Sequence, residues 1–310
     1  MMVASRRRLI AARPALARLV ALLVALLAGG CRADVDACGL AAPPTLAKNQ
    51  TVGLVRIQKT GSTTLAHLWD LQIRRGDREV WNEWSHLNHH DWSKLKAPAR
   101  VHGELLPKKE VVVLNLRDPV ERVLSEYYFC SERLNCVQQT QWDYSHRTSK
   151  NVSALFGRMR QHVFGEAALG LLEWLRWPEN PAHERQAHYV SGYRYGRGAN
   201  ASRVSLDVAA ARLCDAGVVV LLSADLPDAS LALARAELGW EVTADEWAKH
   251  RAPGSIHFDA APKHLAPFPE REAVDDDLRA EIRERNPRDA ALYDRARRIV
   301  ESRAAMLPGG

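Results

Sequence analysis

A short turn between an apolar run and a helical pattern carries the first residues that could bind an anion. In order, the turn reads Gln58-Lys59-Thr60-Gly61-Ser62-Thr63-Thr64. A helix that begins there would offer free backbone N–H groups and the positive end of its dipole. Gly61 would let the backbone approach an anion, Lys59 would add a charge, and the hydroxyl groups would add donors. An ordinary turn before a capped helix is the alternative. The nucleotide-triphosphate loop is disfavoured, because here the lysine precedes the glycine.

A second group of residues follows the strongest strand pattern of the chain. Residues 110–116 read Glu-Val-Val-Val-Leu-Asn-Leu, which predicts a strand covered on both faces. Arg117 stands at its carboxyl end, where open α/β sheets place their ligands, and Ser125 follows about two helical turns later. Arginine can clamp a phosphate bidentately, with serine as a further donor. The alternative is that Arg117 only pairs with Asp118 as local structure.

The two motifs, residues 58–64 and 116–126, resemble the two cofactor motifs of Golgi carbohydrate sulfotransferases. They are most similar to those of heparan-sulfate 6-O-sulfotransferases. The resemblance implies that the sulfate donor is 3′-phosphoadenylyl sulfate (PAPS). The residues that would bind its 5′-phosphosulfate are Lys59, Thr60, Gly61, Ser62, Thr63 and Thr64. Those that would hold its 3′-phosphate are Arg117 and Ser125.

A segment rich in histidine and tryptophan lies between the motifs. Residues 84–92 read Trp-Ser-His-Leu-Asn-His-His-Asp-Trp and resemble the family segment whose proposed catalytic base falls on His89. An unperturbed imidazole titrates at about 6.5, which suits proton transfer. By the same resemblance, Lys59 would steady the leaving phosphate. His86 and His90 are the alternative candidates for the catalytic base. The other interpretations are zinc binding and a structural role, but no zinc signature accompanies these histidines and we expect no metal.

The candidates for binding the acceptor are Trp84, His90, Arg185 and Gln186. Trp84 matches a family position and could stack on a sugar ring, although tryptophan is more often a core residue. Residues 185–186 resemble an Arg-Gln pair in the family's middle region. By resemblance, the expected acceptor is a polysaccharide hydroxyl, with 6-O-sulfation of a heparan-sulfate-like chain favoured. Nearby basic residues could attract an anionic polysaccharide or form a solvated face. They are Arg74, Arg75, Arg78, Lys94, Lys96, Lys108 and Lys109.

An α/β domain would bring these motifs together. Strand patterns lie at 51–57, 110–116 and 218–222. Helical patterns lie at 63–73, 120–129, 167–175, 230–238 and 278–302, the last interrupted near residues 286–287. Residues 76–110 are predicted to be irregular. Alternating strands and helices predict a central, mainly parallel sheet flanked by helices. The resemblance implies the P-loop-NTPase-like sulfotransferase fold.

The N-terminal residues predict a targeting segment. Three arginines at 6–8 precede an apolar run at 19–28, and 13 uncharged residues separate Arg18 from Arg32. That length fits a signal peptide, or a membrane anchor if Arg18 snorkels. We therefore expect a cytoplasmic tail and signal-anchor (or signal peptide) at 1–31, a stem at 32–50, and the sulfotransferase domain at 51–305. An anchor would give a single-pass type II Golgi membrane protein with a luminal domain, whereas cleavage would secrete the domain. A third interpretation of the N-terminal segment is a lipoprotein signal or an organelle-targeting signal.

The amino-acid composition excludes several classes of protein. The chain has 310 residues, 46% hydrophobic and 26% charged, which excludes a disordered tail, a collagen and a polytopic membrane protein. The formal net charge of +6 indicates an anionic partner, and the secretory N-terminus argues against nucleic acid. Sequons at Asn49, Asn151 and Asn200 support a secretory route.

The five cysteines point to two short-range pairs and one free thiol. In an oxidising lumen Cys130 could pair with Cys136, and Cys31 with Cys38. Cys214 precedes a predicted strand and is expected to be a buried thiol.

Overall fold

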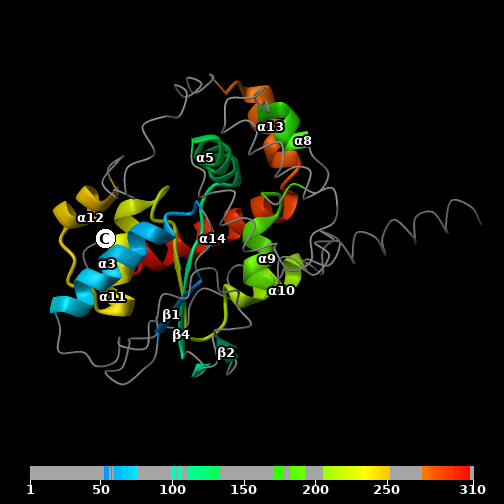
Figure 1. Ribbon diagram of the computed structural model, residues 1–310. Coiled ribbons are helices and arrows are strands. Elements are labelled where there is room, and N and C mark those ends of the chain that lie inside the picture. Colours follow the sequence, from blue (N-terminus) through cyan, green and yellow to red (C-terminus); the bar gives the residue numbers. More distant parts are fainter. Residues whose placement is uncertain are drawn as a thin grey trace, which may run out of the picture. The chain divides into compact units, whose positions relative to one another are not determined.

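A computed structural model describes part of the chain (Figure 1). The described residues are 52–55, 57, 59–75, 99–101, 104–106, 110–132, 171–176, 180, 182–192, 205–251 and 274–307. Contacts divide the chain into two units, Met1–Ala41 and Ala42–Gly310, and every described residue belongs to the second. The predicted tail, anchor and stem (1–50) and the three sequons therefore lie outside the described residues. None of the described helices is both long and apolar enough to cross a bilayer.

Three parallel strands form the centre of the described part. They are β1 (Val52–Val55), β4 (Val111–Asn115) and β5 (Val218–Leu221), in the order β1-β4-β5. Val52 pairs with Val111, and Val112 with Val218. Every residue of these strands is buried, which explains why their sequences are nearly continuous apolar runs. The prediction of an α/β fold with parallel strands flanked by helices is confirmed for this part of the chain.

A short hairpin lies where irregular structure was predicted. Strands β2 (Ala99–Val101) and β3 (Glu104–Leu106) pair antiparallel, with Ala99 opposite Leu106. The prediction of irregular structure for the whole of 76–110 was therefore wrong at this hairpin. Strands of three residues are too short for an alternating pattern to emerge.

The longer helices were predicted with nearly the observed bounds. They are α3 (Ser62–Arg75), α5 (Pro119–Glu132), α11 (Pro227–Leu238), α13 (Asp276–Glu284) and α14 (Pro287–Ala305). The break between α13 and α14 falls at the predicted Asn286-Pro287 step, because proline fits the first position of a helix but not its interior. Of the pattern at 167–175, the structure describes α8 (Leu171–Arg176).

Three short helices were not predicted. They are α9 (Arg185–Ser191), α10 (Leu206–Arg212) and α12 (Ala244–Arg251). Helices α9 and α10 have seven residues each and α12 has eight, which is about two turns and too few for apolar spacing to repeat. All of α9 is buried although most of its side chains are polar, so its sequence does not show the apolar and polar faces of a surface helix.

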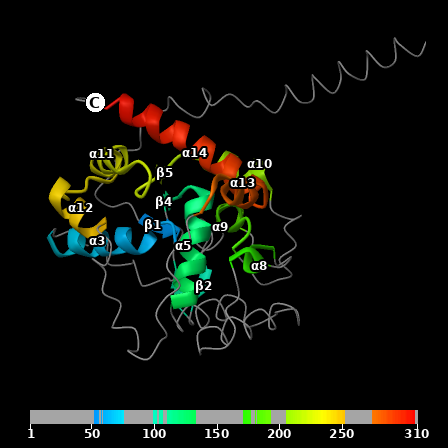
Figure 2. The ribbon, with the colours of Figure 1, turned by 90° about the horizontal axis from the view of Figure 1, so that it is seen from above.

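The helices cover both sides of the sheet. Figures 1 and 2 show α3, α11 and α12 on one side of the strands and α9 and α10 on the other. Helices α11 and α14 contact β5 and each other. Between α3 and α12, Trp240 contacts Trp69 edge-on at 5.9 Å between ring centroids and Trp247 at 6.4 Å. The core therefore continues outward from the sheet into the helical layers.

Cys214 corrects the prediction for the cysteines. It is half-buried and forms a disulfide, so it is not a free thiol. Its partner must be one of the other four cysteines, whose side chains lie outside the described part. The pairs Cys31–Cys38 and Cys130–Cys136 therefore cannot both form, because one of these cysteines is bonded to Cys214.

Candidate functional site

The carboxyl ends of the three strands gather the first motif and Arg117 at one edge of the sheet. Because β1, β4 and β5 are parallel, the segments that follow them leave from the same edge. These segments are the Lys59–Gly61 turn after β1, Arg117 after β4, and Ser223 after β5. Open α/β sheets place their ligands at this edge. The two motifs, 58 residues apart between Lys59 and Arg117, thus meet in space.

The Lys59–Gly61 turn has an unusual backbone. Lys59 has φ 65° and Gly61 has φ 86°, both in the left-handed region that favours glycine. A Cβ on Gly61 would lie 3.0 Å from Ser223 Oγ and 3.2 Å from Asn115 Nδ2, so only glycine fits without a shift. A non-glycine residue in a left-handed conformation is sparsely populated and is found preferentially at ligand sites.

Two side-chain hydrogen bonds within residues 57–62 stabilise the turn. The Thr60 and Ser62 hydroxyls both donate to the Ile57 carbonyl, at 3.0 and 2.8 Å. Their protons are therefore engaged with the protein. Any contribution of these two residues to anion binding would come mainly from their backbone N–H groups.

Asn115 links the turn to the other two strands, and sequence reasoning did not single it out. Its Nδ2 donates to the Thr60 carbonyl, and its Oδ1 accepts from the Ser223 N–H at 3.1 Å. All three residues are buried. The sequence signal was a single polar residue within a strand that is otherwise apolar, at its carboxyl end.

Helix α3 begins directly after the turn, so its N-terminus lies at this edge. Its first intrahelical bond runs from Leu65 N to Gly61 O, at 3.1 Å. By helix geometry, the N–H groups of residues 62–64 have no acceptor within the helix. Thr64 is half-buried on this first turn, and the Thr63 side chain is not among the described groups. The helix start thus supplies several donors and a positive dipole end for an anion.

The Arg117 guanidinium lies against the turn. Its NH1 donates to the Lys59 carbonyl at 3.2 Å, and 24% of the side chain is exposed. Among the described residues, no acceptor meets its Nε–H. Asp118 instead caps α5, because its Oδ1 accepts from Val120 N at 2.9 Å and Glu121 N at 3.1 Å. Arg117 is therefore more than a local partner of Asp118 and retains donor capacity beside the turn.

Acidic groups surround this arginine. Burial lowers the pKa of Arg117, while Asp225 and Glu121 act to raise it. Burial also raises the pKa of Asp225, although its Oδ2 accepts from Asp118 N at 2.8 Å. Arginine nevertheless stays protonated at neutral pH. An anion at this point would meet a cation whose charge is partly balanced by its neighbours.

The other predicted site residues occupy different surroundings. Ser125 is half-buried on α5, two turns beyond Arg117. Arg185 is buried at the start of α9, where its NH2 lies 2.6 Å from Glu126 Oε1. Gln186 reaches the site by binding the backbone of Arg117. Acceptor binding by Arg185 and Gln186 stays a prediction.

The predicted base and groove residues cannot be placed. His89, Trp84 and His90 lie outside the described residues, as do His86 and His102. Within the described ranges, no group of three or more His, Cys, Asp or Glu side chains is arranged to hold a metal ion.

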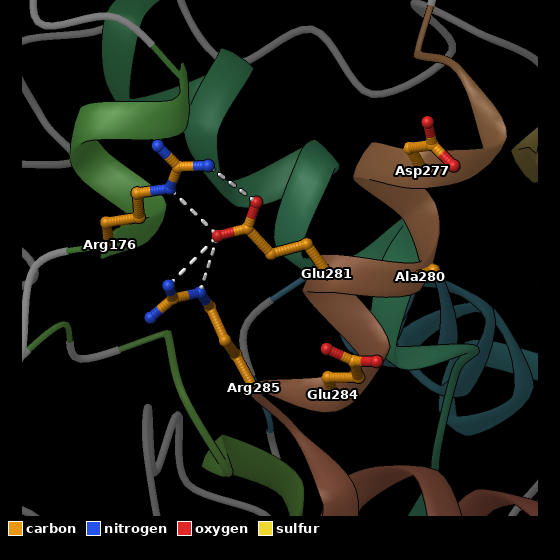
Figure 3. A pocket seen from close by; sticks show the side chains of 6 residues that line it. All are labelled: Arg176, Asp277, Ala280, Glu281, Glu284 and Arg285. Atoms are coloured by element: carbon orange, nitrogen blue, oxygen red, sulfur yellow. Dashed lines mark hydrogen bonds and ion pairs between the residues drawn. The ribbon is translucent and has the colours of Figure 1, made fainter.

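A surface hollow of about 630 Å³ lies elsewhere, between α8 and α13 (Figure 3). Glu281 bonds there to Arg176 Nε and NH2 at 2.9 and 3.0 Å and to Arg285 Nε at 3.0 Å. Hydrogen bonds from Arg176, and then from Arg285, lower the pKa of Glu281 to about 2. Because these charges satisfy one another and no residue of the turn lines the hollow, it is an ion-pair cluster apart from the candidate site.

Comparison with known proteins gives no match: neither a family model nor a curated protein matches this chain. The candidate site therefore depends on the geometry of the chain's own residues.

Proposed function

We propose that this protein is a PAPS-dependent carbohydrate sulfotransferase with a P-loop-NTPase-like sulfotransferase fold. It moves a sulfuryl group from PAPS to a polysaccharide hydroxyl, with 6-O-sulfation of a heparan-sulfate-like chain the favoured reaction. The observation that carries the proposal is the contact between Arg117 NH1 and the Lys59 carbonyl. It supports the idea that two motifs distant in sequence serve the two anionic ends of one nucleotide.

The chain's own residues suit the two ends of such a donor. The Lys59 charge, the amides of residues 60–64 and the start of α3 form a cradle for the 5′-phosphosulfate. The positive φ of Gly61 and its close packing against Ser223 and Asn115 fix the shape of the turn that would receive this group. Arg117, whose Nε–H meets no acceptor in the described part of the chain, and Ser125 would hold the 3′-phosphate.

Sulfuryl transfer requires a base and a group that stabilises the leaving phosphate. In the proposed reaction the acceptor oxygen forms a bond to sulfur, the bond from sulfur to the phosphate oxygen breaks, and His89 takes the hydroxyl proton. Lys59 stabilises the charge that grows on the departing bisphosphate. No metal is assigned to this reaction, because the Lys and Arg charges supply the electrostatic stabilisation.

The proposed location is the Golgi membrane, with a single-pass type II anchor and a luminal catalytic domain, or secretion if the signal is cleaved. The disulfide at Cys214 supports an oxidising compartment, because disulfides persist there and are rare in the cytosol.

The test is transfer of radiolabelled sulfate from PAPS to heparan, chondroitin and algal-type polysaccharides. We expect transfer by the wild type, and a loss of at least about a hundredfold in Lys59→Ala and in His89→Ala, with both proteins folded. Arg117→Ala should chiefly weaken binding of adenosine 3′,5′-bisphosphate, by about ten- to a hundredfold, because it removes a charge-assisted hydrogen bond. Near-normal turnover in either of the first two variants would refute the role given to that residue.

A catalytically inactive relative that binds glycan or nucleotide is the alternative. It would bind adenosine 3′,5′-bisphosphate with an affinity that depends on Arg117, yet transfer no sulfate to any polysaccharide. Binding and transfer measured on the same preparation separate the two functions.

A further inference from the structure

We propose that Gln186 is a positioning residue that sets the direction of Arg117, and that helices α9 and α14 hold Gln186 in place by exchanging N-terminal caps. The inference rests on the proposed function, because it assumes that Arg117 binds the 3′-phosphate of an adenosine nucleotide. It gives Gln186 a role within the protein rather than a contact with the acceptor.

Gln186 binds both polar groups of the Arg117 backbone. Its Oε1 accepts from Arg117 N at 2.9 Å, and its Nε2 donates to Arg117 O at 2.9 Å. Gln186 is 1% exposed, and its loss would leave the Arg117 N–H and carbonyl without these partners. A carboxamide supplies one acceptor and one donor in this geometry, whereas a carboxylate of the same shape supplies acceptors only.

The position of Gln186 is fixed by a carboxylate from α14. Asp289, which is fully buried near the start of α14, accepts from Gln186 N at 3.2 Å and from Ala187 N at 2.7 Å. These amides lie in the first turn of α9, where they lack intrahelical acceptors. Asp289 therefore caps α9 from another helix.

A carboxylate before α9 caps α14 in return. Glu184 Oε1 accepts from Arg288 N at 3.0 Å, and Oε2 accepts from Asp289 N at 2.7 Å. The Glu184 N–H donates to Asn286 Oδ1 at 2.9 Å. Glu184 has φ 53°, a strained value that tertiary contacts must hold in place. The two helix starts thus determine each other's position.

Buried ion pairs attach this arrangement to α5, the helix that follows Arg117. Arg122 NH1 lies 2.7 Å from Glu126 Oε2, and Arg122 Nε lies 3.8 Å from Asp289 Oδ2. Arg185 NH2 lies 2.6 Å from Glu126 Oε1. Two cations and two anions are balanced within this buried cluster, so its members resist displacement.

These contacts restrain Arg117 at its backbone. Its N–H and carbonyl are fixed by Gln186, and its NH1 is bonded to Lys59 O at 3.2 Å. The side chain therefore leaves a fixed peptide in a fixed direction beside the turn. Without Gln186, the guanidinium would keep its charge but lose its alignment, and bidentate phosphate binding depends on alignment.

The test compares two probes, adenosine 3′,5′-bisphosphate and adenosine 5′-monophosphate, titrated calorimetrically into the full chain. We expect Gln186→Ala to lower the preference for the bisphosphate about tenfold while the affinity for the monophosphate stays near the wild-type value. A purely structural role would lower the melting temperature but leave the preference unchanged. The ratio of the two affinities is therefore the decisive quantity.

Gln72→Ala is a matched control. Gln72 is 4% exposed, and its Oε1 accepts from Glu241 N at 2.8 Å, so the variant also loses a buried bond between glutamine and backbone. We expect the nucleotide preference of this variant to equal that of the wild type.

Gln186→Glu keeps the shape of the side chain but removes the N–H group that donates to Arg117 O. This variant replaces Gln186→Ala in the test if Gln186→Ala does not fold. At neutral pH, Gln186→Glu should lose the preference for the bisphosphate over the monophosphate. As the pH falls and the new carboxyl is protonated, the preference relative to wild type at the same pH should recover. If Gln186→Ala and Gln186→Glu both retain the wild-type preference, the inference is wrong and the proposed function survives. If the wild type binds neither nucleotide, both are wrong.

Discussion

Replacing Asn115 by alanine should cost stability and also disable the candidate site. The side chain bonds to the Thr60 carbonyl and to the Ser223 N–H, and all three residues are buried. Removing it leaves one buried carbonyl and one buried amide without a partner, at about 1–3 kcal/mol each. The expected loss is about 2–6 kcal/mol, a large share of the roughly 5–15 kcal/mol that stabilises a typical domain.

The assay combines denaturant unfolding with titration of adenosine 3′,5′-bisphosphate below the unfolding transition. Asn180→Ala is the matched control, because Asn180 is also buried and bonds to two backbone groups. Its Nδ2 donates to Trp174 O at 2.6 Å, and its Oδ1 accepts from Ala182 N at 2.9 Å. We expect similar losses of stability in the two variants, but weakened nucleotide binding only in Asn115→Ala, where the turn is released.

Two outcomes would contradict this reasoning. Wild-type nucleotide affinity in folded Asn115→Ala would mean that the turn needs no support from β4 to bind an anion. An equal loss of affinity in both variants would mean that binding reports global stability rather than the geometry of the turn.

Two further predictions concern the glycines and a buried carboxylate. Gly61→Ala should cost about 1–3 kcal/mol and weaken nucleotide binding, because φ is 86° and a Cβ would meet Ser223. Gly217→Ala, whose Cβ would lie 2.5 Å from Glu110 O, should destabilise the fold yet spare binding, as unfolding and titration would reveal. Burial raises the pKa of Glu237 to about 7, despite the opposing charge of Arg303. Since the unfolded chain releases this proton near pH 4.5, the contribution of Glu237 to wild-type stability should fall as pH rises from 4.5 to 7. Glu237→Gln removes this titrating group. The free energy of unfolding of the variant relative to wild type should therefore rise by up to about 1.4 kcal/mol per pH unit between pH 4.5 and 7. A difference that stays constant with pH would contradict the raised pKa of Glu237.

Much of the fold could be predicted because its strands and longer helices carry strong local patterns. Val111–Asn115 and Val218–Leu221 are apolar runs that require cover on both faces, and Pro287 marks the start of α14. The short helix α9 and the hairpin of β2 and β3 could not be predicted. They have too few residues for a periodic signal, and α9 is buried throughout, so packing rather than propensity stabilises this helix.

At the candidate site, sequence alone determined which residue types stand at the ends of the strands: the Lys-Thr-Gly turn after β1 and Arg117 after β4. The tertiary structure decided what those residues contact. Gln186 was singled out as a candidate for binding the acceptor, and the structure shows that its carboxamide binds the Arg117 backbone, a contact that the sequence did not predict. Asn115 was not predicted at all, yet it joins the turn to β5. Local sequence cannot reveal such pairings, because a buried polar group is satisfied by whichever partner the packing of distant segments brings within hydrogen-bonding distance.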